Sequence, residues 1–203
     1  MDKPFNMLVC GITGCGKTFY VLDLLENEFK HKFDYIIIIC PTFLYNKTYN
    51  RKFILKDDCV IIITVDKNLN EELKKIITIY KDKNEHTLII IDDCANLYDA
   101  KLKATSLTEL AFHGRHFNIS TWVITQKYNA IVKDFRQNVK NLVLFYDKDK
   151  KSREAAFEEN DIGITKEEKE SIVKKLKNTN SKLVMNLFPP FSWEINGSDE
   201  KRI

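Results

Sequence analysis

The chain has 203 residues, of which 44% are hydrophobic and 30% are charged, and its formal net charge is +3 at pH 7. This length suits one α/β domain with a sizeable core, and the composition is typical of a globular protein. Purely aliphatic runs reach four residues, far short of the roughly 20 that span a bilayer. The small net charge does not indicate a surface that coats nucleic acid throughout, so any DNA contact would be local or built up by assembling subunits.

The five cysteines form no C-x-x-C pair, and their odd number argues against a disulfide framework. Most of them lie in or beside apolar runs, where a free cysteine behaves as a small buried hydrophobe. The N-terminus leads straight into the first apolar run, without a signal pattern. We therefore expect a reducing, intracellular setting.

The first apolar run, Met7–Cys10, predicts a strand, and a glycine-rich segment follows it directly. This segment, Gly11–Thr18, reads G-I-T-G-C-G-K-T and is a complete G-x-x-x-x-G-K-T phosphate-binding loop. Its glycines let the backbone curl, so that N–H groups face phosphates at the start of the next helix. Lys17 is expected to reach the β- and γ-phosphates, and Thr18 to offer its hydroxyl to Mg²⁺. We expect this loop to bind a nucleoside triphosphate such as ATP, with further contacts from Gly11, Thr13, Gly14, Cys15 and Gly16.

Further apolar runs predict strands that are buried on both faces, which favours a mostly parallel sheet. These runs are Tyr35–Cys40, Val60–Thr64, Leu88–Ile91, Thr121–Thr125 and Leu142–Tyr146. Apolar residues at helical spacing lie between them: Val21, Leu24, Leu25 and Phe29; Leu73, Ile76, Ile77 and Tyr80; Leu107, Leu110 and Ala111. The segment Asn46–Asp58 has no clear period and is expected to be a loop or an insertion. Alternating strands and helices predict a three-layer α/β fold with a central sheet.

Two aspartates, Asp92 and Asp93, directly follow the run Leu88–Ile91, which is typical of a Walker B segment. Four aliphatic residues bury the strand, so Asp92 is expected at its carboxyl edge, where open α/β sheets bind ligands. There it would hold the Mg²⁺ that Thr18 also contacts. Asp93 stands where many ATPases carry a glutamate that polarises the attacking water. The alternative for both aspartates is a solvated turn after the strand.

Two arginines are candidates for an arginine finger, which acts on the γ-phosphate of a neighbouring subunit. Arg115 follows the helix after Asp93, and Arg136 precedes the last core strand. The alternative for each is pairing with helix-end carbonyls or with a surface carboxylate. His113 and His116, beside Arg115, are too few and too isolated for a metal site.

A polar amide, Gln126, ends the predicted strand Thr121–Thr125. In this place it can hydrogen-bond both the γ-phosphate and the attacking water. Its presence predicts that this strand lies between the strands of the phosphate loop and of Asp92, as in RecA-like ATPases. The alternative is an amide that caps the following helix.

The composition becomes rich in lysine and glutamate after Tyr146. Thr165 and Glu168 have the spacing of a capping box, which predicts a helix that continues to about Leu176. The run Leu183–Leu187 predicts a final strand. No internal repeat is present, so we expect one P-loop domain over residues 1–203, with a core at about 6–146 and an extension at about 147–203.

These motifs occur in an order that resembles a known family. The segments are the phosphate loop, Cys40-Pro41-Thr42, Ile90–Asp93, Gly114-Arg115-His116-x-Asn118-Ile119-Ser120, Thr125-Gln126 and Phe135-Arg136-x-Asn138. The chain is similar from about Asn6 to Tyr146 to the viral genome-packaging ATPases of the FtsK–HerA superfamily, in the poxvirus-type branch of large DNA viruses and virophages. Asp93 departs from the glutamate that is common in the superfamily, although the viral branch often shows paired aspartates.

The resemblance implies a RecA-like ATPase that hydrolyses ATP with Mg²⁺ and moves double-stranded DNA into a preformed capsid. It also implies a homo-oligomeric ring, capsid or portal partners, and a location in the host cytoplasm, the viral factory or the virion. Other readings are a different FtsK–HerA-type DNA motor or helicase, a nucleotide kinase, and a nucleotide-dependent switch. Stimulation of ATP hydrolysis by double-stranded DNA would separate a motor from a kinase or a switch.

Overall fold

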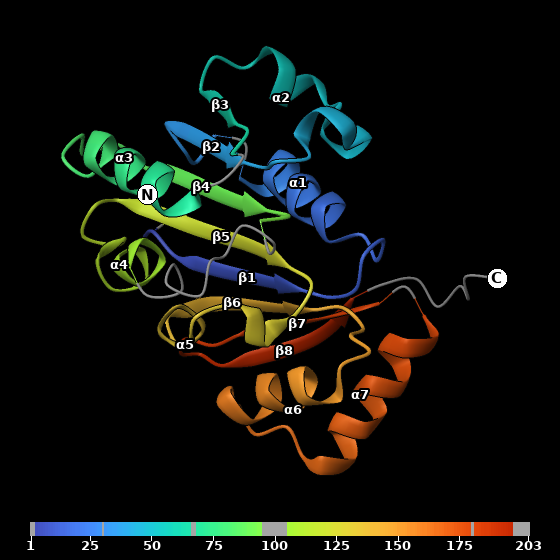
Figure 1. Ribbon diagram of the computed structural model, residues 1–203. Helices are drawn as coiled ribbons and strands as arrows, with labels where there is room; N and C mark the ends of the chain where they lie inside the picture. The colour runs from blue at the N-terminus through green and yellow to red at the C-terminus, as the bar shows by residue number, and fades with distance from the viewer. Residues whose placement is uncertain (1–2, 30, 66–67, 95–104, 180, 197–203) are drawn as a thin grey trace.

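The computed structural model describes residues 3–29, 31–65, 68–94, 105–179 and 181–196 (Figure 1). Its strands are β1 (Asn6–Cys10), β2 (Tyr35–Ile39), β3 (Val60–Ile63), β4 (Thr87–Asp92), β5 (Ile119–Thr125), β6 (Val139–Leu144), β7 (Lys182–Asn186) and β8 (Ser192–Asn196). Its α-helices are α1 (Lys17–Glu28), α2 (Lys52–Lys56), α3 (Leu69–Tyr80), α4 (Ser106–His113), α5 (Lys133–Arg136), α6 (Lys150–Glu159) and α7 (Lys166–Asn178). Short 3₁₀ helices are η1 (Phe43–Tyr45), η2 (Lys47–Tyr49) and η5 (Tyr128–Ala130). The end of the expected domain, 197–203, lies outside the described residues.

The strands form one eight-stranded sheet in the order β3-β2-β4-β5-β1-β6-β7-β8. All pairings from β3 to β6 are parallel, whereas β7 pairs antiparallel with β6 and β8 antiparallel with β7. Strand β5 therefore lies between β1, which leads into the phosphate loop, and β4, which ends at Asp92. This order confirms the RecA-like arrangement that Gln126 predicted.

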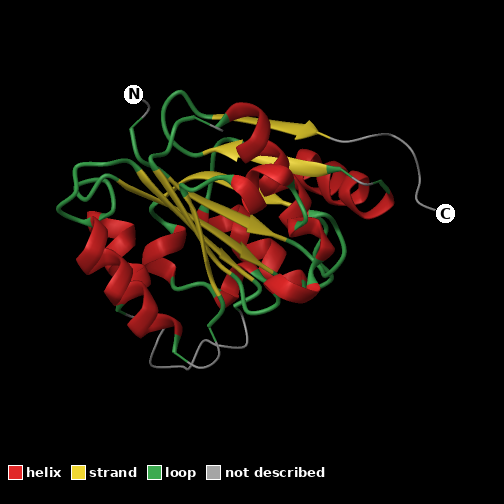
Figure 2. Ribbon diagram, turned by 90° about the horizontal axis from the view of Figure 1, so that it is seen from above, coloured by secondary structure: helices red, strands yellow, loops and turns green. Residues whose placement is uncertain are grey.

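Alternate residues of the buried strands enter two separate cores, as the period of two requires. In β1, Leu8 packs in the core that α3, α4, α6 and α7 cover. Its neighbour Val9 packs in the core that α1 and α2 cover. Figure 2 shows helices on both sides of the sheet. The predicted three-layer α/β fold with a mostly parallel sheet is thus confirmed.

The carboxyl ends of the central strands meet at one edge, because the parallel pairing keeps their registers close. Cys10 of β1 pairs with Thr125 of β5, and Asp92 of β4 pairs with Ile124. We call this the carboxyl edge of the sheet. It lies at the right in Figure 1, where the arrows of β4 and β5 end.

Two regions differ from the sequence expectations. The segment Asn46–Asp58 is not a plain loop, because η2 and α2 form within it and Phe53 and Ile54 of α2 are buried. Strand β8, which follows Leu187, was not predicted; its residues alternate in exposure on an edge strand, so only half of the strand is apolar. The capping box of Thr165 and Glu168 is present at the start of α7, as expected. None of the helices in the described ranges is long and apolar enough to cross a bilayer.

Candidate active site

The predicted phosphate loop joins β1 to α1 at the carboxyl edge. Gly11 must be a glycine because a Cβ atom there would lie 2.5 Å from Cβ of Phe145 on the neighbouring strand's extension. Gly14 and Gly16 have φ angles of 77° and 95°, in the left-handed region that favours glycine. The backbone of the loop therefore favours glycine at each of these three positions.

Lys17 begins α1, and its ammonium folds back over the loop. Its Nζ donates a hydrogen bond of 2.8 Å to the carbonyl of Ile12 and lies 3.9 Å from Sγ of Cys15. The helix N-terminus adds a partial positive charge at the same place. Together the ammonium and the helix end favour an anionic ligand over the loop.

The loop opens onto a hollow of about 320 Å³ at the carboxyl edge. Residues from four segments line it: Thr13, Gly14, Gly16, Lys17, Thr18 and Phe19 from the loop and α1; Asn46 and Thr48 from the segment after β2; Asp92 and Asp93 after β4; and Ile124, Thr125 and Gln126 from β5 and its end. The fold thus brings the loop, both aspartates and Gln126 to one hollow. Gln126 is exposed there and follows β5 directly.

Asp92 is buried at the end of β4 with 4% exposure. Its Oδ2 atom accepts hydrogen bonds from the hydroxyls of Thr18, at 2.8 Å, and Tyr49, at 2.6 Å. Burial raises the pKa of Asp92, while the hydrogen bonds from Tyr49 and Thr18 and the charge of Lys17 act against this rise. A bound cation would favour the ionised carboxylate further.

The pair of Thr18 and Asp92 fits Mg²⁺. This ion prefers hard oxygen ligands at about 2.0–2.1 Å in octahedral geometry, so adjacent ligands lie roughly 3 Å apart. The hydroxyl of Thr18 and Oδ2 of Asp92 are 2.8 Å apart. Among the described residues no group of three or more His, Cys, Asp or Glu side chains could hold a metal. The ion would therefore complete its shell with phosphate and water oxygens, as Mg²⁺ usually does.

Asp93 has a left-handed backbone, with φ at 55°, and its side chain is exposed in the hollow. Its Oδ2 atom accepts a hydrogen bond of 3.0 Å from the hydroxyl of Thr42. The backbone turn after Asp92 separates the two carboxylates, so one is held in the core and the other faces solvent. This placement allows Asp93 to contact a water molecule beside the phosphates.

From the sequence, Thr42 was noted within Cys40-Pro41-Thr42 without a role, and Asn46, Thr48 and Tyr49 were missed. The role of Thr42 could have been found, because it lies just past β2, and β2 neighbours the strand of Asp92. Tyr49 could not, because its segment has no periodic pattern and its contact spans 43 residues of sequence.

Arg136 is held inside its own chain, with 9% exposure. Its guanidinium donates to both carboxylate oxygens of Glu159, at 2.9 and 2.6 Å, and to the carbonyl of Ile131 at 2.7 Å. This geometry opposes a finger role for Arg136, because reaching a neighbouring subunit would break all three bonds. Arg136 instead pairs with the carboxylate of Glu159, which agrees with the alternative given in the sequence analysis.

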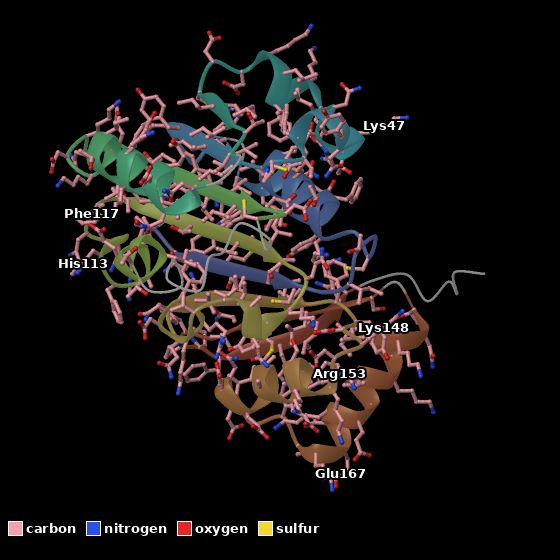
Figure 3. All side chains as sticks on the ribbon, viewed as in Figure 1. Lys47, His113, Phe117, Lys148, Arg153 and Glu167 are labelled. Carbon is pink, nitrogen blue, oxygen red and sulfur yellow. The ribbon has the colours of Figure 1, made fainter. Side chains whose placement is uncertain are left out.

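Arg115 is exposed in the turn that leads from α4 into β5, at the amino ends of the parallel strands. Its guanidinium lies over the ring of Phe188, with 5.4 Å to the ring centroid. In Figure 3 its neighbours His113 and Phe117 lie at the left, whereas Lys47 and Lys148 lie at the right. Arg115 is therefore at the edge opposite to its own hollow and cannot reach a phosphate bound there.

Comparisons with known proteins agree with this architecture. The DNA packaging protein OPG160 of variola virus is 28% identical over 154 residues, which are 71% of this chain and 54% of that protein. The chain thus spans about half the length of the curated relatives that it matches. The DNA-packaging ATPase B204 of Sulfolobus turreted icosahedral virus has the same fold, with a TM-score of 0.71 at 15% identity over 98% of this chain and 100% of that chain.

The genome packaging NTPase B204 of Sulfolobus turreted icosahedral virus 2, solved in complex with AMPPCP, aligns with a TM-score of 0.68 at 18% identity. That alignment covers 97% of this chain and 98% of that chain. The family described as Poxvirus A32 protein matches residues 1–186, which is most of the sequence. The match confirms the resemblance drawn from the motifs, and the chain belongs to the poxvirus A32 protein family.

Proposed function

We propose that this protein is an ATP-hydrolysing motor that moves double-stranded DNA into a viral capsid. The observation that carries the proposal is the hollow at the carboxyl edge, where the phosphate loop, the Thr18–Asp92 pair, Asp93 and Gln126 meet. Membership of the poxvirus A32 family and the packaging role that the relatives' names give support the DNA substrate.

The candidate site residues of the hollow have different roles in this proposal. Lys17 and the loop N–H groups bind the β- and γ-phosphates, and Lys17 moves from the Ile12 carbonyl to a phosphate oxygen. Thr18 and Asp92 would hold Mg²⁺, which when bound would neutralise the charge that develops on the phosphates. Asp93 orients the attacking water and accepts its proton, and Gln126 donates to the γ-phosphate and aligns the same water.

The partners follow from the family and remain part of the proposal. They are double-stranded DNA, further copies of the chain in a ring, and capsid or portal proteins. Arg115 lies at the edge opposite to its own hollow, so as an arginine finger it would serve a neighbouring subunit, which is consistent with a ring. The place of action is the compartment of the infected cell where viral genomes are packaged.

The test is ATP hydrolysis with and without double-stranded DNA, in the wild type and in Lys17→Ala. We expect DNA to stimulate wild-type turnover, and the stimulation to weaken as salt rises, because phosphate contacts release counterions. Lys17→Ala should lose turnover and bind ATP much more weakly in calorimetry. Wild-type ATP affinity in this variant would contradict the assignment of the loop, and unstimulated turnover would contradict a DNA motor.

A further inference from the structure

The segment from the end of β2 to the end of η2 supplies one hydroxyl to each of the two aspartates. Thr42 donates to Oδ2 of Asp93 at 3.0 Å, and Tyr49 donates to Oδ2 of Asp92 at 2.6 Å. The two donors lie seven positions apart in sequence, and the aspartates are consecutive. One short segment therefore contacts both carboxylates of the hollow.

The ring of Tyr49 is anchored, so its hydroxyl has little freedom. The side chain is 2% exposed and belongs to the core beneath α1 and α2. Its ring packs against that of Phe43, with centroids 5.0 Å apart. A buried phenol needs a hydrogen-bond partner, and here that partner is a carboxylate, which makes the bond a strong one.

The hydroxyls of Thr18 and Tyr49 both donate to Oδ2 of Asp92, but Mg²⁺ binding would affect the two hydrogen bonds differently. Thr18 belongs to the phosphate loop, and its oxygen would turn from donating to Asp92 to coordinating the ion. Tyr49 is fixed in the core and would keep its bond. It would then hold the carboxylate in the orientation that the ion requires, because partners of metal ligands fix the ligand's geometry.

We propose that Tyr49 is a positioning residue for the metal-holding Asp92, and that Thr42 is a positioning residue for Asp93. The inference rests on the proposed ATPase function. The Tyr49 hydroxyl would act on metal binding through Asp92, and the Thr42 hydroxyl would act on turnover through Asp93. Loss of the Tyr49 hydroxyl weakens the contribution of Mg²⁺ to nucleotide binding, whereas loss of the Thr42 hydroxyl lowers turnover and leaves binding unchanged.

The first experiment compares ATP binding with Mg²⁺ and with EDTA by calorimetry, in the wild type and in Tyr49→Phe. Phenylalanine keeps the ring and its packing and removes only the hydroxyl. We expect metal-free affinity to stay at the wild-type value and the gain in affinity from Mg²⁺ to fall about tenfold, in the range seen for partners of metal ligands.

Tyr128→Phe is the matched control. Tyr128 is also buried, and its hydroxyl also contacts a carboxylate, Glu159 at 3.0 Å, but it lies outside the hollow. Both variants lose one hydroxyl-to-carboxylate bond, and Tyr128→Phe also removes the acceptor of the Asn160 amide at 2.9 Å, so the control should lose at least as much stability. Only Tyr49→Phe should change the response to Mg²⁺. An unchanged or stronger Mg²⁺ response in Tyr49→Phe would overturn the role of Tyr49, and an equal change in Tyr128→Phe would show a general loss of stability instead.

The second experiment uses Thr42→Val, which keeps the shape, and Thr42→Ser, which keeps the hydroxyl. Thr42→Val should lower kcat about tenfold with unchanged affinity for Mg²⁺ and ATP, and Thr42→Ser should restore most of the loss. Wild-type kcat in Thr42→Val, or failure of serine to restore it, overturns the role of Thr42. A wild-type protein that binds no ATP would overturn the proposed function itself, which separates the two failures.

Discussion

Asp93 shows at the scale of one residue how the backbone selects the side chain. Its φ of 55° lies in the left-handed region, where aspartate and asparagine are several-fold enriched over other non-glycine residues. Glutamate, which is common in the superfamily at this position, is less well suited to that backbone. The hydrogen bond from Thr42 further places the shorter carboxylate. The aspartate at this position thus has a local structural reason.

Two substitutions at this position should separate the effect on turnover from the effect on stability. Asp93→Asn keeps the left-handed backbone and ATP binding but removes the base, so turnover should fall at least about 100-fold. Asp93→Glu keeps a base but strains the turn, so it should cost about 1 kcal/mol of stability. Single-turnover kinetics measure the loss of turnover, and denaturant unfolding measures the loss of stability. Normal turnover in Asp93→Asn would place the base elsewhere and bring Gln126 into question.

At the scale of elements, the salt bridge between Arg136 and Glu159 ties α5 to α6. Side chains at both ends of the pair are largely buried, with 10% and 22% exposure. The guanidinium also lies 4.8 Å from the ring centroid of Tyr128 in η5. One cation therefore links three short elements that precede or follow β6.

This salt bridge should make stability depend on pH. Burial acts to raise the pKa of Glu159, but hydrogen bonds from Arg136 and Tyr128 outweigh it, and the pKa is lowered. A lowered folded-state pKa gives stability that is complete above the unfolded value of about 4.3 and is lost as pH falls through the folded value.

The variant Glu159→Gln tests this dependence by urea unfolding at several pH values. It should be less stable than the wild type by about 2 kcal/mol above about pH 5, because a charged hydrogen-bond partner is lost. The difference should shrink at lower pH, where the wild-type carboxylate also becomes neutral. A difference that stays constant down to about pH 3 would mean that the charge of Glu159 does not stabilise the fold.

The elements differ in how far the sequence could predict them. Strands β2 and β4 contain continuous aliphatic runs, and α3 buries Leu73, Ile76 and Ile77 at helical spacing. These patterns were sufficient to predict the three elements from the sequence. The segment 46–58 folds into turns too short to show a period. Its position depends on contacts with α1 and Asp92 that are remote in sequence. The loop and its partners on β4 and β5 were therefore predictable, but Tyr49 was not.

At the scale of the whole molecule, the two edges of the sheet carry different groups of the proposed site. The hollow lies at the carboxyl edge, whereas Arg115 lies in the turn before β5 at the opposite edge. In a ring in which the carboxyl edge of one subunit faces the Arg115 turn of the next, the guanidinium would enter the neighbour's hollow. A single subunit lacks this contribution, so we expect its activity to depend on assembly.

Mixing experiments test this dependence on assembly. Specific activity should rise with protein concentration, and Arg115→Ala subunits should regain part of their activity when mixed with Lys17→Ala subunits. The first supplies an intact phosphate loop and the second an intact arginine. Arg136→Ala is the comparison variant: it should lower the melting temperature, which Arg115→Ala should not. Concentration-independent activity without complementation would disprove the trans arginine and leave ATP binding unaffected.

The antiparallel pairing of β7 and β8 determines at which edge of the sheet a label attached at the end of β8 would lie. Asn196, at the end of β8, pairs with Lys182, and the next residue of β7, Leu183, pairs with Leu144 at the carboxyl end of β6. Asn6, by contrast, begins β1 at the other edge. A fluorophore placed at Asn196 would therefore report from the edge where nucleotide is proposed to bind. An affinity tag or surface tether joined before Phe5 would leave that edge clear but would lie at the edge of Arg115, so the amino end suits nucleotide-binding work on single subunits better than work on the proposed ring.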